Sequence, residues 1–259
     1  MLLTRFVAFL SLFRINNALF AGFACAAGFI IAGYSFGSTV CLYSLAFICS
    51  VAFANAHNDC TDYKIDCINR PDRPLPSGKI SRKAALFAAC FSLFLSVFLG
   101  FCISLYAAIF FACIGFCSFI YNIFLKGMPF AGNLAVALLT SSPFAVSNLP
   151  QLIFFSLVLT LARELIKDIE DMKGDDSLAL KTLPLVCGVK FSLALVFVCE
   201  TLCLLALAFW KPLALFAVAP CMAFSVYFAL KKRWRHSQML LKISMAAGLL
   251  CYLFNAVAS

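Results

Sequence analysis

The sequence predicts an all-α integral membrane protein. Of its 259 residues, 64% are hydrophobic and only 12% are charged, and the mean hydropathy is +1.02. Soluble domains are about half apolar and a quarter charged. The long apolar runs do not alternate in short segments as a transmembrane β-barrel does, so helices are the spanning elements that fit them. Most of the 14 cysteines lie inside these runs, where a free cysteine acts as a small hydrophobic side chain.

Apolar runs of about twenty residues predict nine transmembrane helices. In chain order they lie near residues 15–33, 40–57, 84–103, 105–125, 131–148, 151–167, 188–208, 212–230 and 239–257. Only a short turn at residues 100–104 separates the third span from the fourth. We therefore expect the whole chain, residues 1–259, to form a single transmembrane domain.

The positive charges predict the orientation of these spans. Of the 20 Lys and Arg residues, 19 lie on one side of the predicted bundle and only Lys211 lies on the other. By the positive-inside rule, the N-terminus lies on the cytoplasmic side of the cell membrane, and nine spans leave the C-terminus outside. The net charge of +9 suits contact with anionic lipid headgroups. We expect membrane lipids, and not nucleic acid, to be the partners of this charge.

Ten of the 11 acidic residues lie in two short segments, 59–72 and 164–176. Each segment contains three aspartates at spacing i, i+3, i+7: Asp59, Asp62 and Asp66 in the first, and Asp168, Asp171 and Asp175 in the second. On an α-helix this spacing places three carboxylates within about 60° of one another. Asn55 shares the first face, and the nearby His57 is more typical of a hydrogen-bonded polar residue than of a ligand. Three carboxylates on one stripe repel each other unless cations lie between them.

The two acidic segments resemble weak internal copies. Each begins at the cytoplasmic end of an even-numbered span, and the two lie four spans apart. Arg73-Pro-Leu-Pro76 follows the first triplet, and Lys181-Thr-Leu-Pro184 follows the second. We therefore predict two pseudo-repeated four-helix halves plus one further helix, around a central cavity that the two stripes face.

Hard oxygen ligands at this spacing suit Mg²⁺, which proteins commonly share with substrate phosphates. Two facing stripes would hold two or more Mg²⁺ ions with a diphosphate between them. The diphosphate would be the polar end of a lipid whose tail lies among apolar helices, away from water. A solvated acidic loop is the alternative, and two copies with identical spacing make it less favoured. Basic residues close to the stripes would add phosphate contacts: Arg70, Arg73, Lys126, Lys167 and Lys181.

Other polar residues lie at the cytoplasmic ends of the first and fourth spans. Asn122 and Lys126 share a face of the fourth span beside Tyr121, which favours a position at the cavity. Arg14 and Asn17 are three residues apart on the first span. They would either contact substrate or extend to the interface and cap the helix, and both interpretations stay open.

At these residues the chain resembles the UbiA-type intramembrane prenyltransferase superfamily, over nearly its whole length. The superfamily pattern N-D-x-x-D-x-x-x-D is present as Asn58, Asp59, Asp62 and Asp66, and the second pattern, D-x-x-D-x-x-x-D, as Asp168, Asp171 and Asp175. The resemblance implies nine transmembrane helices around a lipid-accessible cavity. It also implies that these seven residues bind Mg²⁺ and a prenyl diphosphate.

The flanking residues narrow the resemblance. Segments 65–81 and 163–175, with Lys181-Thr-Leu-Pro184, are most similar to the archaeal digeranylgeranylglyceryl phosphate synthases. The segment 121–126 resembles the Tyr…Lys segment of the family, and the usual R-P-x-N is here Arg14-Ile-Asn-Asn17, without the proline. The resemblance implies Mg²⁺-dependent transfer of a geranylgeranyl group from geranylgeranyl diphosphate to the hydroxyl of geranylgeranylglyceryl phosphate. This reaction forms the second ether bond of archaeal membrane lipids.

The implied site has three groups of residues. The catalytic metal-binding aspartates would be Asp59, Asp62, Asp168 and Asp171. Asp66 and Asp175 would complete or orient the metal shells. The substrate-binding residues would be Asn17, Asn55, Asn58, Arg70, Arg73, Tyr121, Lys126 and Lys167.

Three other functions are compatible with parts of this pattern. A prenyltransferase with an aromatic acceptor, a quinone or chlorophyll precursor, fits because chlorophyll synthases share much of the Pro-Ser-Gly loop. A CDP-alcohol phosphotransferase also uses membrane aspartates, but its D-G-x-x-A-R signature is absent at Asp62. A cation transporter with acidic gates would need carboxylates deep within its spans, whereas these stripes lie at the cytoplasmic ends.

Overall fold

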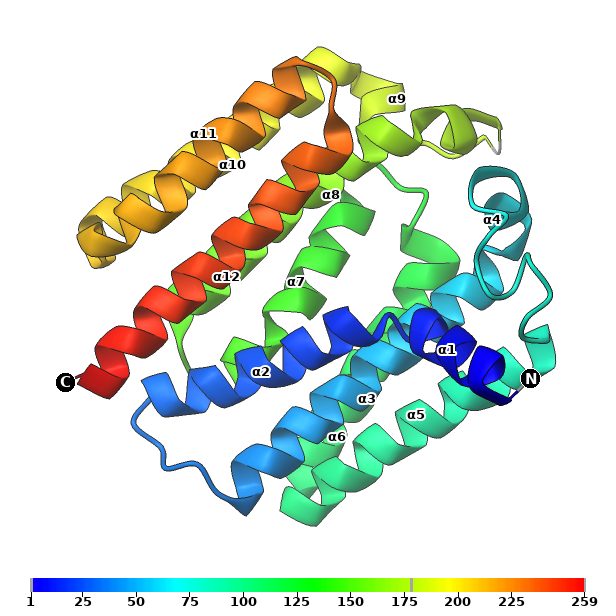
Figure 1. The fold of residues 1–259 in the computed structure, drawn as a ribbon, viewed down its shortest axis with the longest axis horizontal. Helices are drawn as coiled ribbons and strands as arrows, with labels where there is room; N and C mark the ends of the chain where they lie inside the picture. Colours follow the sequence, from blue (N-terminus) through cyan, green and yellow to red (C-terminus); the bar gives the residue numbers. More distant parts are fainter. Residues whose placement is uncertain (1, 178, 259) are drawn as a thin grey trace. The chain divides into compact units, whose positions relative to one another are not determined.

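Figure 1 shows the chain as a computed structural model, whose described residues are 2–177 and 179–258. Every regular element in this described part is a helix, so the all-α prediction is confirmed. The chain divides into two compact units. The first unit consists of Met1–Phe29 and Ser35–Phe124, and the second of Ile30–Tyr34 and Leu125–Ser259.

The first unit is built around one central helix, α3, which contacts both α5 and α6. Its elements are α1 (Leu2–Leu12), α2 (Ile15–Ile31), α3 (Ser38–Thr61), α4 (Tyr63–Asn69), α5 (Arg82–Ile103), α6 (Leu105–Ile120) and most of the π-helix η1 (Tyr121–Leu125). Serine hydroxyls cap two helices: Ser81 Oγ accepts the N–H of Ala84 at 3.2 Å, and Ser104 Oγ accepts that of Ala107 at 3.1 Å. The cap at Ser104 separates α5 from α6, as the turn at residues 100–104 predicts.

The second unit is arranged around α8, which contacts α7, α10 and α12. Its elements are α7 (Ala131–Ala145), α8 (Pro150–Ser177), α9 (Leu183–Cys187), α10 (Val189–Trp210), the 3₁₀ turn η2 (Pro212–Ala214), α11 (Leu215–Leu230) and α12 (Trp234–Ala258). Glu200, a buried carboxylate of this unit, has hydroxyl groups close to it. Ser225 Oγ donates to Glu200 Oε1 at 3.0 Å and lies 2.9 Å from Ser237 Oγ, so a polar contact joins α10, α11 and α12.

Six of the described helical segments are long and apolar enough to cross a membrane. They are α3, α5, α6 with η1, α10, η2 with α11, and α12. Residues 4–12 and 15–31, bent by 53°, would form a seventh span. Helices also occupy the positions of the remaining predicted spans, but α7 has only 15 residues and α8 carries several charges. The multi-pass membrane fold is therefore confirmed, whereas the count of nine spans stays a prediction.

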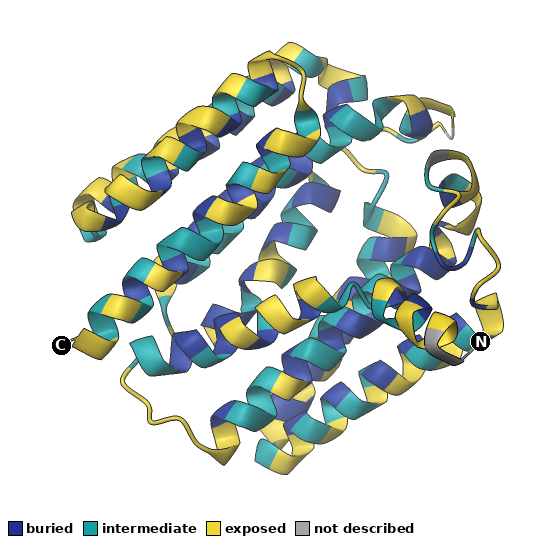
Figure 2. Cartoon of the chain, viewed as in Figure 1, coloured by how far each residue is buried: buried dark blue, intermediate teal, exposed yellow. Residues whose placement is uncertain are grey.

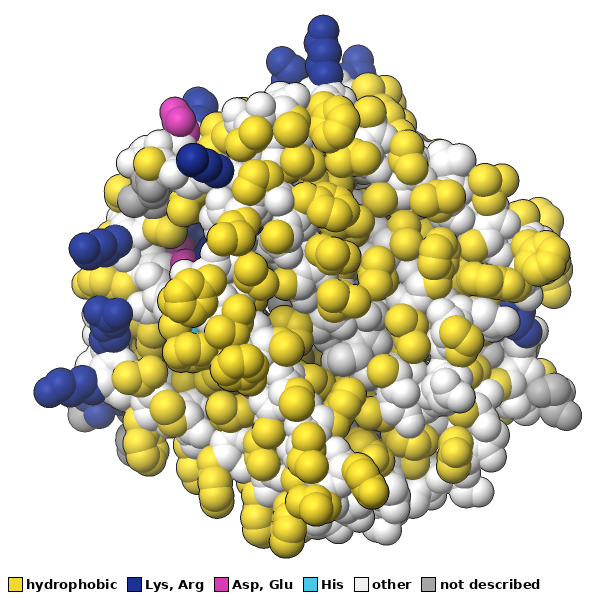
Figure 3. Space-filling model, turned by 180° about the vertical axis from the view of Figure 1, so that it is seen from behind, with side chains coloured by type: hydrophobic (Ala, Val, Ile, Leu, Met, Phe, Trp, Pro, Cys, Tyr) yellow, Lys and Arg dark blue, Asp and Glu magenta, His cyan; other side chains and the backbone are white. Residues whose placement is uncertain are grey.

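Many large hydrophobic side chains are exposed on the surface of the helices, and contact of such side chains with water is unfavourable. Figure 2 shows exposed and buried residues alternating around most helices. On the face shown in Figure 3, hydrophobic side chains cover most of the area, and Lys and Arg side chains lie at its edges. Helix α5, for example, exposes five phenylalanine side chains along its length: Phe87, Phe91, Phe94, Phe98 and Phe101. Contiguous apolar surface of this kind marks contact with lipid.

Helix α1 was not expected from the sequence. The apolar run that contains it is interrupted at Arg14, whose φ of +46° lies outside the right-handed helical region. The chain therefore bends between α1 and α2 instead of continuing as one straight helix. This bend is important for the site, because it fixes the direction in which Arg14 leaves the backbone.

We expect Gly100→Ala to lower the stability of the first unit. A Cβ at Gly100 would lie 2.9 Å from the carbonyl oxygen of Ala107 and 2.9 Å from Cδ2 of Phe111, so α5 and α6 would have to separate. The expected loss is about 1–3 kcal/mol, as for overpacked cores. Gly37→Ala is the matched control, since nothing lies within 4 Å of a Cβ at Gly37. Thermal unfolding in detergent measures both, and equal midpoints for the two variants would contradict this packing.

Candidate active site

The first aspartate triplet lies where α3 ends and α4 begins. Asp59 is in the last turn of α3, Asp66 is on α4, and Asp62 lies between the two helices with φ −84° and ψ 5°. The expectation of one unbroken helical stripe is therefore wrong for this triplet. The N–H groups of Asp62 and Asp66 still donate to the carbonyls of Asn58 and Asp62, at 2.9 and 2.8 Å. The chain thus keeps a nearly helical path through the break.

All three carboxylates of this triplet are buried. Asp59, Asp62 and Asp66 are only 3%, 6% and 4% exposed. Arg14 Nη2 lies 2.8 Å from Asp59 Oδ1, while Arg73 Nη1 lies 3.2 Å from the same atom and 2.5 Å from Asp66 Oδ2. A buried carboxylate is strongly disfavoured unless it is paired and hydrogen-bonded. The two guanidinium groups supply that pairing for Asp59 and Asp66.

Two asparagines extend this network. Arg14 Nη1 donates to Asn55 Oδ1 at 2.9 Å, and Asn55 Nδ2 donates in turn to the carbonyl of Phe13 at 3.1 Å. Arg14 Nη2 also lies 3.4 Å from Asn58 Oδ1. Arg14, whose role stayed open on sequence grounds, therefore binds the motif itself.

The side chain of Asn58 is held from the other side by a chain of polar groups. Its Nδ2 donates to Asn122 Oδ1 at 3.0 Å, and Asn122 Nδ2 lies 2.9 Å from His57 Nδ1. The ring of His57 lies between Phe53 and Phe119, at centroid distances of 5.5 and 5.3 Å. His57 is thus a packed, hydrogen-bonded polar residue, as its position predicts. Asn122 belongs to η1, and π-helical turns are frequent at functional sites.

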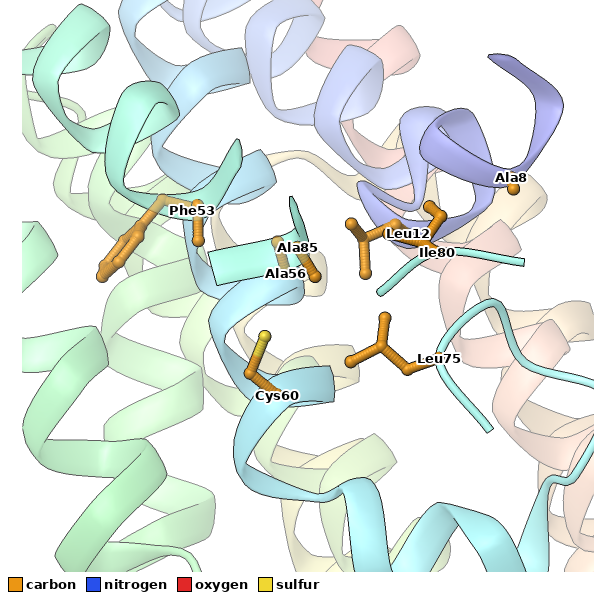
Figure 4. Packing of buried hydrophobic residues seen from close by; sticks show 9 residues of the cluster. Ala8, Leu12, Phe53, Ala56, Cys60, Leu75, Ile80 and Ala85 are labelled. Atoms are coloured by element: carbon orange, nitrogen blue, oxygen red, sulfur yellow. The ribbon is translucent and has the colours of Figure 1, made fainter. Parts of the chain in front are cut away.

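A hydrophobic cluster anchors the loop that carries Arg73. Figure 4 shows Leu75 and Ile80 of this loop lying close to side chains of α1, α3 and α5. The other labelled members of this cluster are Ala8, Leu12, Phe53, Ala56, Cys60 and Ala85. Leu75 and Ile80 are both buried, and the N–H of Ile80 donates to the carbonyl of Pro74 at 3.1 Å. Burial of two aliphatic side chains on either side of a tight turn fixes the loop, and with it the guanidinium of Arg73.

The second triplet lies in the second unit, on one continuous helix. Asp168, Asp171 and Asp175 all belong to α8, so the expected helical stripe is confirmed here. Asn133 Nδ2, from the first turn of α7, donates to Asp168 Oδ2 at 2.8 Å. Burial raises the pKa of Asp168 to about 7, and the hydrogen bond from Asn133 acts in the opposite direction. Asn133 was not among the predicted site residues, although a polar residue near the start of an apolar span is the signal that would have found it.

Other charges of α8 are paired within the second unit. Glu170 accepts from Arg235 Nε and Gln238 Nε2, both at 2.8 Å, and this contact fastens α8 to the start of α12. Glu164 contacts Arg163, and Lys167 Nζ lies 3.5 Å from Glu164 Oε2. Lys167, predicted to bind substrate, therefore lies beside a carboxylate one turn before Asp168.

The remaining predicted site residues lie at helix ends. Asn17 is exposed in the first turn of α2. Arg70 ends α4, Tyr121 begins η1, and Lys126 follows η1 directly. Their contacts with substrate stay predictions.

The chemical type of the oxygen atoms around the first triplet suits Mg²⁺. Within residues 2–177 and 179–258, no three His, Cys, Asp or Glu side chains converge closely enough to hold a metal ion. The oxygens that surround Arg14 and Arg73 are nevertheless carboxylate and amide oxygens, the donors that Mg²⁺ prefers. Because Mg²⁺ keeps several waters and substrate oxygens, one or two carboxylates per ion are enough.

Residues 18–251 match the UbiA prenyltransferase family. The chain belongs to this family. Its similarity extends to curated relatives named digeranylgeranylglyceryl phosphate synthase. The protein of that name from Methanosphaera stadtmanae is 39% identical over 190 residues, covering 70% of each chain. The one from Methanoregula boonei is 32% identical and covers 96% of this chain and 98% of that relative.

Solved structures of family members show the same fold. A structure of a digeranylgeranylglyceryl phosphate synthase matches with a TM-score of 0.76 at 26% identity, covering 98% of this chain and 99% of the other. A UbiA homologue from Archaeoglobus fulgidus, bound to DMAPP and Mg²⁺, matches with a TM-score of 0.72 at 18% identity, covering 96% of this chain and 99% of that one.

We expect Asn133→Ala to shift the acidic limb of the activity–pH profile to higher pH. The hydrogen bond from Asn133 favours the ionised form of Asp168, so its loss raises the pKa of Asp168 further. Less of the carboxylate is then ionised at a given pH near 7. The profile of kcat/KM against pH measures the shift. Ser142→Ala is the matched control on the same helix, because Ser142 Oγ donates only along α7, to the carbonyl of Leu139. A limb that stays at the wild-type pH in Asn133→Ala would refute this role.

Proposed function

We propose that this protein transfers a geranylgeranyl group from geranylgeranyl diphosphate to the free hydroxyl of geranylgeranylglyceryl phosphate. The observation that carries the proposal is the similarity, over two thirds or more of both chains, to proteins named digeranylgeranylglyceryl phosphate synthase. Both aspartate patterns of the family are complete in this sequence. The product has a second ether bond on the glycerol backbone, the linkage of archaeal membrane lipids.

In the proposed site, the aspartates of both triplets bind the diphosphate end of the donor through Mg²⁺. Asp59, Asp62, Asp168 and Asp171 would hold the metal, with Asn58, Asp66 and Asp175 completing its surroundings. The Archaeoglobus fulgidus homologue was solved with a prenyl diphosphate and Mg²⁺, which supports this assignment. When bound, Mg²⁺ would offset the charge that develops on the leaving diphosphate.

The reaction needs few groups beyond those that bind the phosphates. The bond from C1 of the prenyl group to the diphosphate oxygen breaks, a bond from C1 to the acceptor oxygen forms, and the hydroxyl proton passes to the released diphosphate. Arg70, Arg73, Lys126 and Lys167 would bind the diphosphate or the phosphate of the acceptor. Asn17, Asn55 and Tyr121 would contribute neutral contacts. The apolar helices would enclose the prenyl chain and keep water from the reactive carbon.

The proposed architecture has nine transmembrane helices around a lipid-accessible cavity. The N-terminus and the aspartate motifs lie on the cytoplasmic side, because 19 of 20 basic residues fall on that side of the nine-span topology. The division of the chain after Phe124 falls between the fourth and fifth predicted spans. That division supports two related four-helix halves with one further helix.

We expect Asp62→Ala and Asp171→Ala to abolish transfer while the folded protein persists. Each removes one carboxylate of a complete motif, and loss of at least about a hundredfold in kcat is the expected scale for a group that stabilises developing charge. Asp72→Ala and Asp176→Ala are matched controls, because both residues are exposed and lie outside the motif positions. Turnover of labelled geranylgeranyl diphosphate in detergent measures all four variants. Near-wild-type turnover of either motif variant would refute the assignment.

The identity of the acceptor can be measured directly. We expect purified protein with Mg²⁺ and labelled geranylgeranyl diphosphate to prenylate geranylgeranylglyceryl phosphate in preference to aromatic acceptors offered in the same mixture. Mass spectrometry of the products distinguishes an ether lipid from a prenylated quinone or chlorophyll precursor. A dominant aromatic product would contradict the proposed acceptor and leave the family assignment intact.

A further inference from the structure

One carboxylate oxygen of Asp59 and one of Asp66 in the first triplet are already bound by arginine. Asp59 Oδ1 accepts from Arg14 at 2.8 Å and from Arg73 at 3.2 Å, which uses both lone pairs of that oxygen. Asp66 Oδ2 accepts from Arg73 at 2.5 Å. A divalent cation and these guanidinium groups therefore compete for the same two carboxylates.

The position of Arg14 is built into the backbone. A positive φ, here +46°, is uncommon for a residue other than glycine and persists only where its surroundings enforce it. The side chain of Asn55 binds two adjacent residues of this bend: it accepts from Arg14 Nη1 and donates to the carbonyl of Phe13. The guanidinium is consequently directed at the triplet by the bend between α1 and α2.

The position of Arg73 is fixed independently of Arg14. Its loop is held on α1, α3 and α5 by the buried side chains of Leu75 and Ile80. The carbonyl of Arg73 accepts from the N–H of Ser77 at 3.0 Å and from Ser77 Oγ at 2.7 Å. Two separate segments of the chain thus each deliver one guanidinium to Asp59, and the guanidinium of Arg73 also reaches Asp66.

The charges around the first triplet favour binding of Mg²⁺ together with a diphosphate over binding of Mg²⁺ alone. The formal charges of Asp59, Asp62, Asp66, Arg14 and Arg73 sum to −1, and the positive charge of Arg70 also acts on Arg14. A free Mg²⁺ ion bound to Asp59 or Asp66 would meet the positive charge of these guanidinium groups unless it displaced them. A diphosphate supplies oxygens that guanidinium groups bind well, so it can accept the displaced arginines.

We propose that Arg14 and Arg73 are displaceable counter-ions of the first triplet, so that Mg²⁺ binds there tightly only together with a diphosphate. This inference rests on the proposed function and specifies the order in which the metal and the diphosphate bind. The arginines hold the carboxylates until the metal and the diphosphate arrive together, and they then transfer to phosphate oxygens. Arg14 and Arg73 are in this sense positioning residues that select metal-diphosphate over the metal alone.

The test is Mg²⁺ binding without any acceptor, measured by calorimetry on the full-length protein in detergent. We expect free Mg²⁺ to bind the wild-type protein about tenfold more tightly when inorganic pyrophosphate is present, the scale on which one nearby charge shifts ion binding. Arg73→Gln and Arg14→Gln should bind Mg²⁺ alone about tenfold more tightly than the wild type. They should also lose most of the enhancement by pyrophosphate.

Lys64→Gln is the matched control, because it removes one positive charge from an exposed position on α4. It should leave both Mg²⁺ affinities at the wild-type values. Thermal unfolding adds a second readout: the arginine variants should be less stable without Mg²⁺ and should gain more from Mg²⁺ than the wild type does, since an unpaired buried carboxylate is strongly disfavoured.

The outcomes separate this inference from the proposed function. If the arginine variants bind Mg²⁺ alone no more tightly than the wild type, the ion pairs are purely structural and the inference is wrong, while transfer by the wild type stands. If no variant binds Mg²⁺ with or without pyrophosphate, both the metal site and the inference are overturned.

Discussion

The ion pairs that Arg14 and Arg73 form with Asp59 and Asp66 are the constraint on which the first unit depends. Removing carboxylates from water is unfavourable enough that the chain must deliver positive charge to them. One arginine comes from the bend between α1 and α2, and the other from a loop fastened by a hydrophobic cluster. The bend and the fastened loop are otherwise hard to explain, because neither is needed to pack α3 against α5. Local backbone geometry in this unit follows from the electrostatics of its aspartates.

The second motif has the same aspartate spacing as the first, but its backbone and its hydrogen-bond partners differ. Its aspartates lie on an unbroken helix, and the partner of Asp168 is the neutral amide of Asn133. A neutral donor stabilises a carboxylate without adding charge, so it leaves the attraction for a divalent cation in place. Guanidinium groups at the first motif reduce that attraction. Guanidinium groups thus bind Asp59 and Asp66 of the first motif, whereas a neutral amide binds Asp168 of the second, although the two sequence patterns are the same.

Periodicity predicts the helices of this chain well and its long-range contacts poorly. The i, i+3, i+7 spacing correctly predicts one face of α8, because nothing interrupts that helix. It fails at Asp62, where α3 ends without the glycine or proline that usually signals a break. Arg14 lies 45 residues from Asp59, and Asn133 lies 35 residues from Asp168. Contacts across such distances depend on how helices pack, and a single sequence contains no local signal for them.

Glu200 shows how a carboxylate is accommodated when it has only a structural role in such a bundle. It is the one acidic residue outside the two motif segments, and it is 3% exposed. Its Oε1 accepts from Ser225 Oγ, which in turn lies 2.9 Å from Ser237 Oγ. An ion path across the membrane would need a series of carboxylates along the spans. This chain provides one, enclosed by α10, α11 and α12, and places the other ten at the predicted cytoplasmic ends. Carboxylates that are predicted to lie at one membrane face, each triplet beside a hydrophobic bundle, are suited to holding the polar end of a lipid and not to conducting an ion.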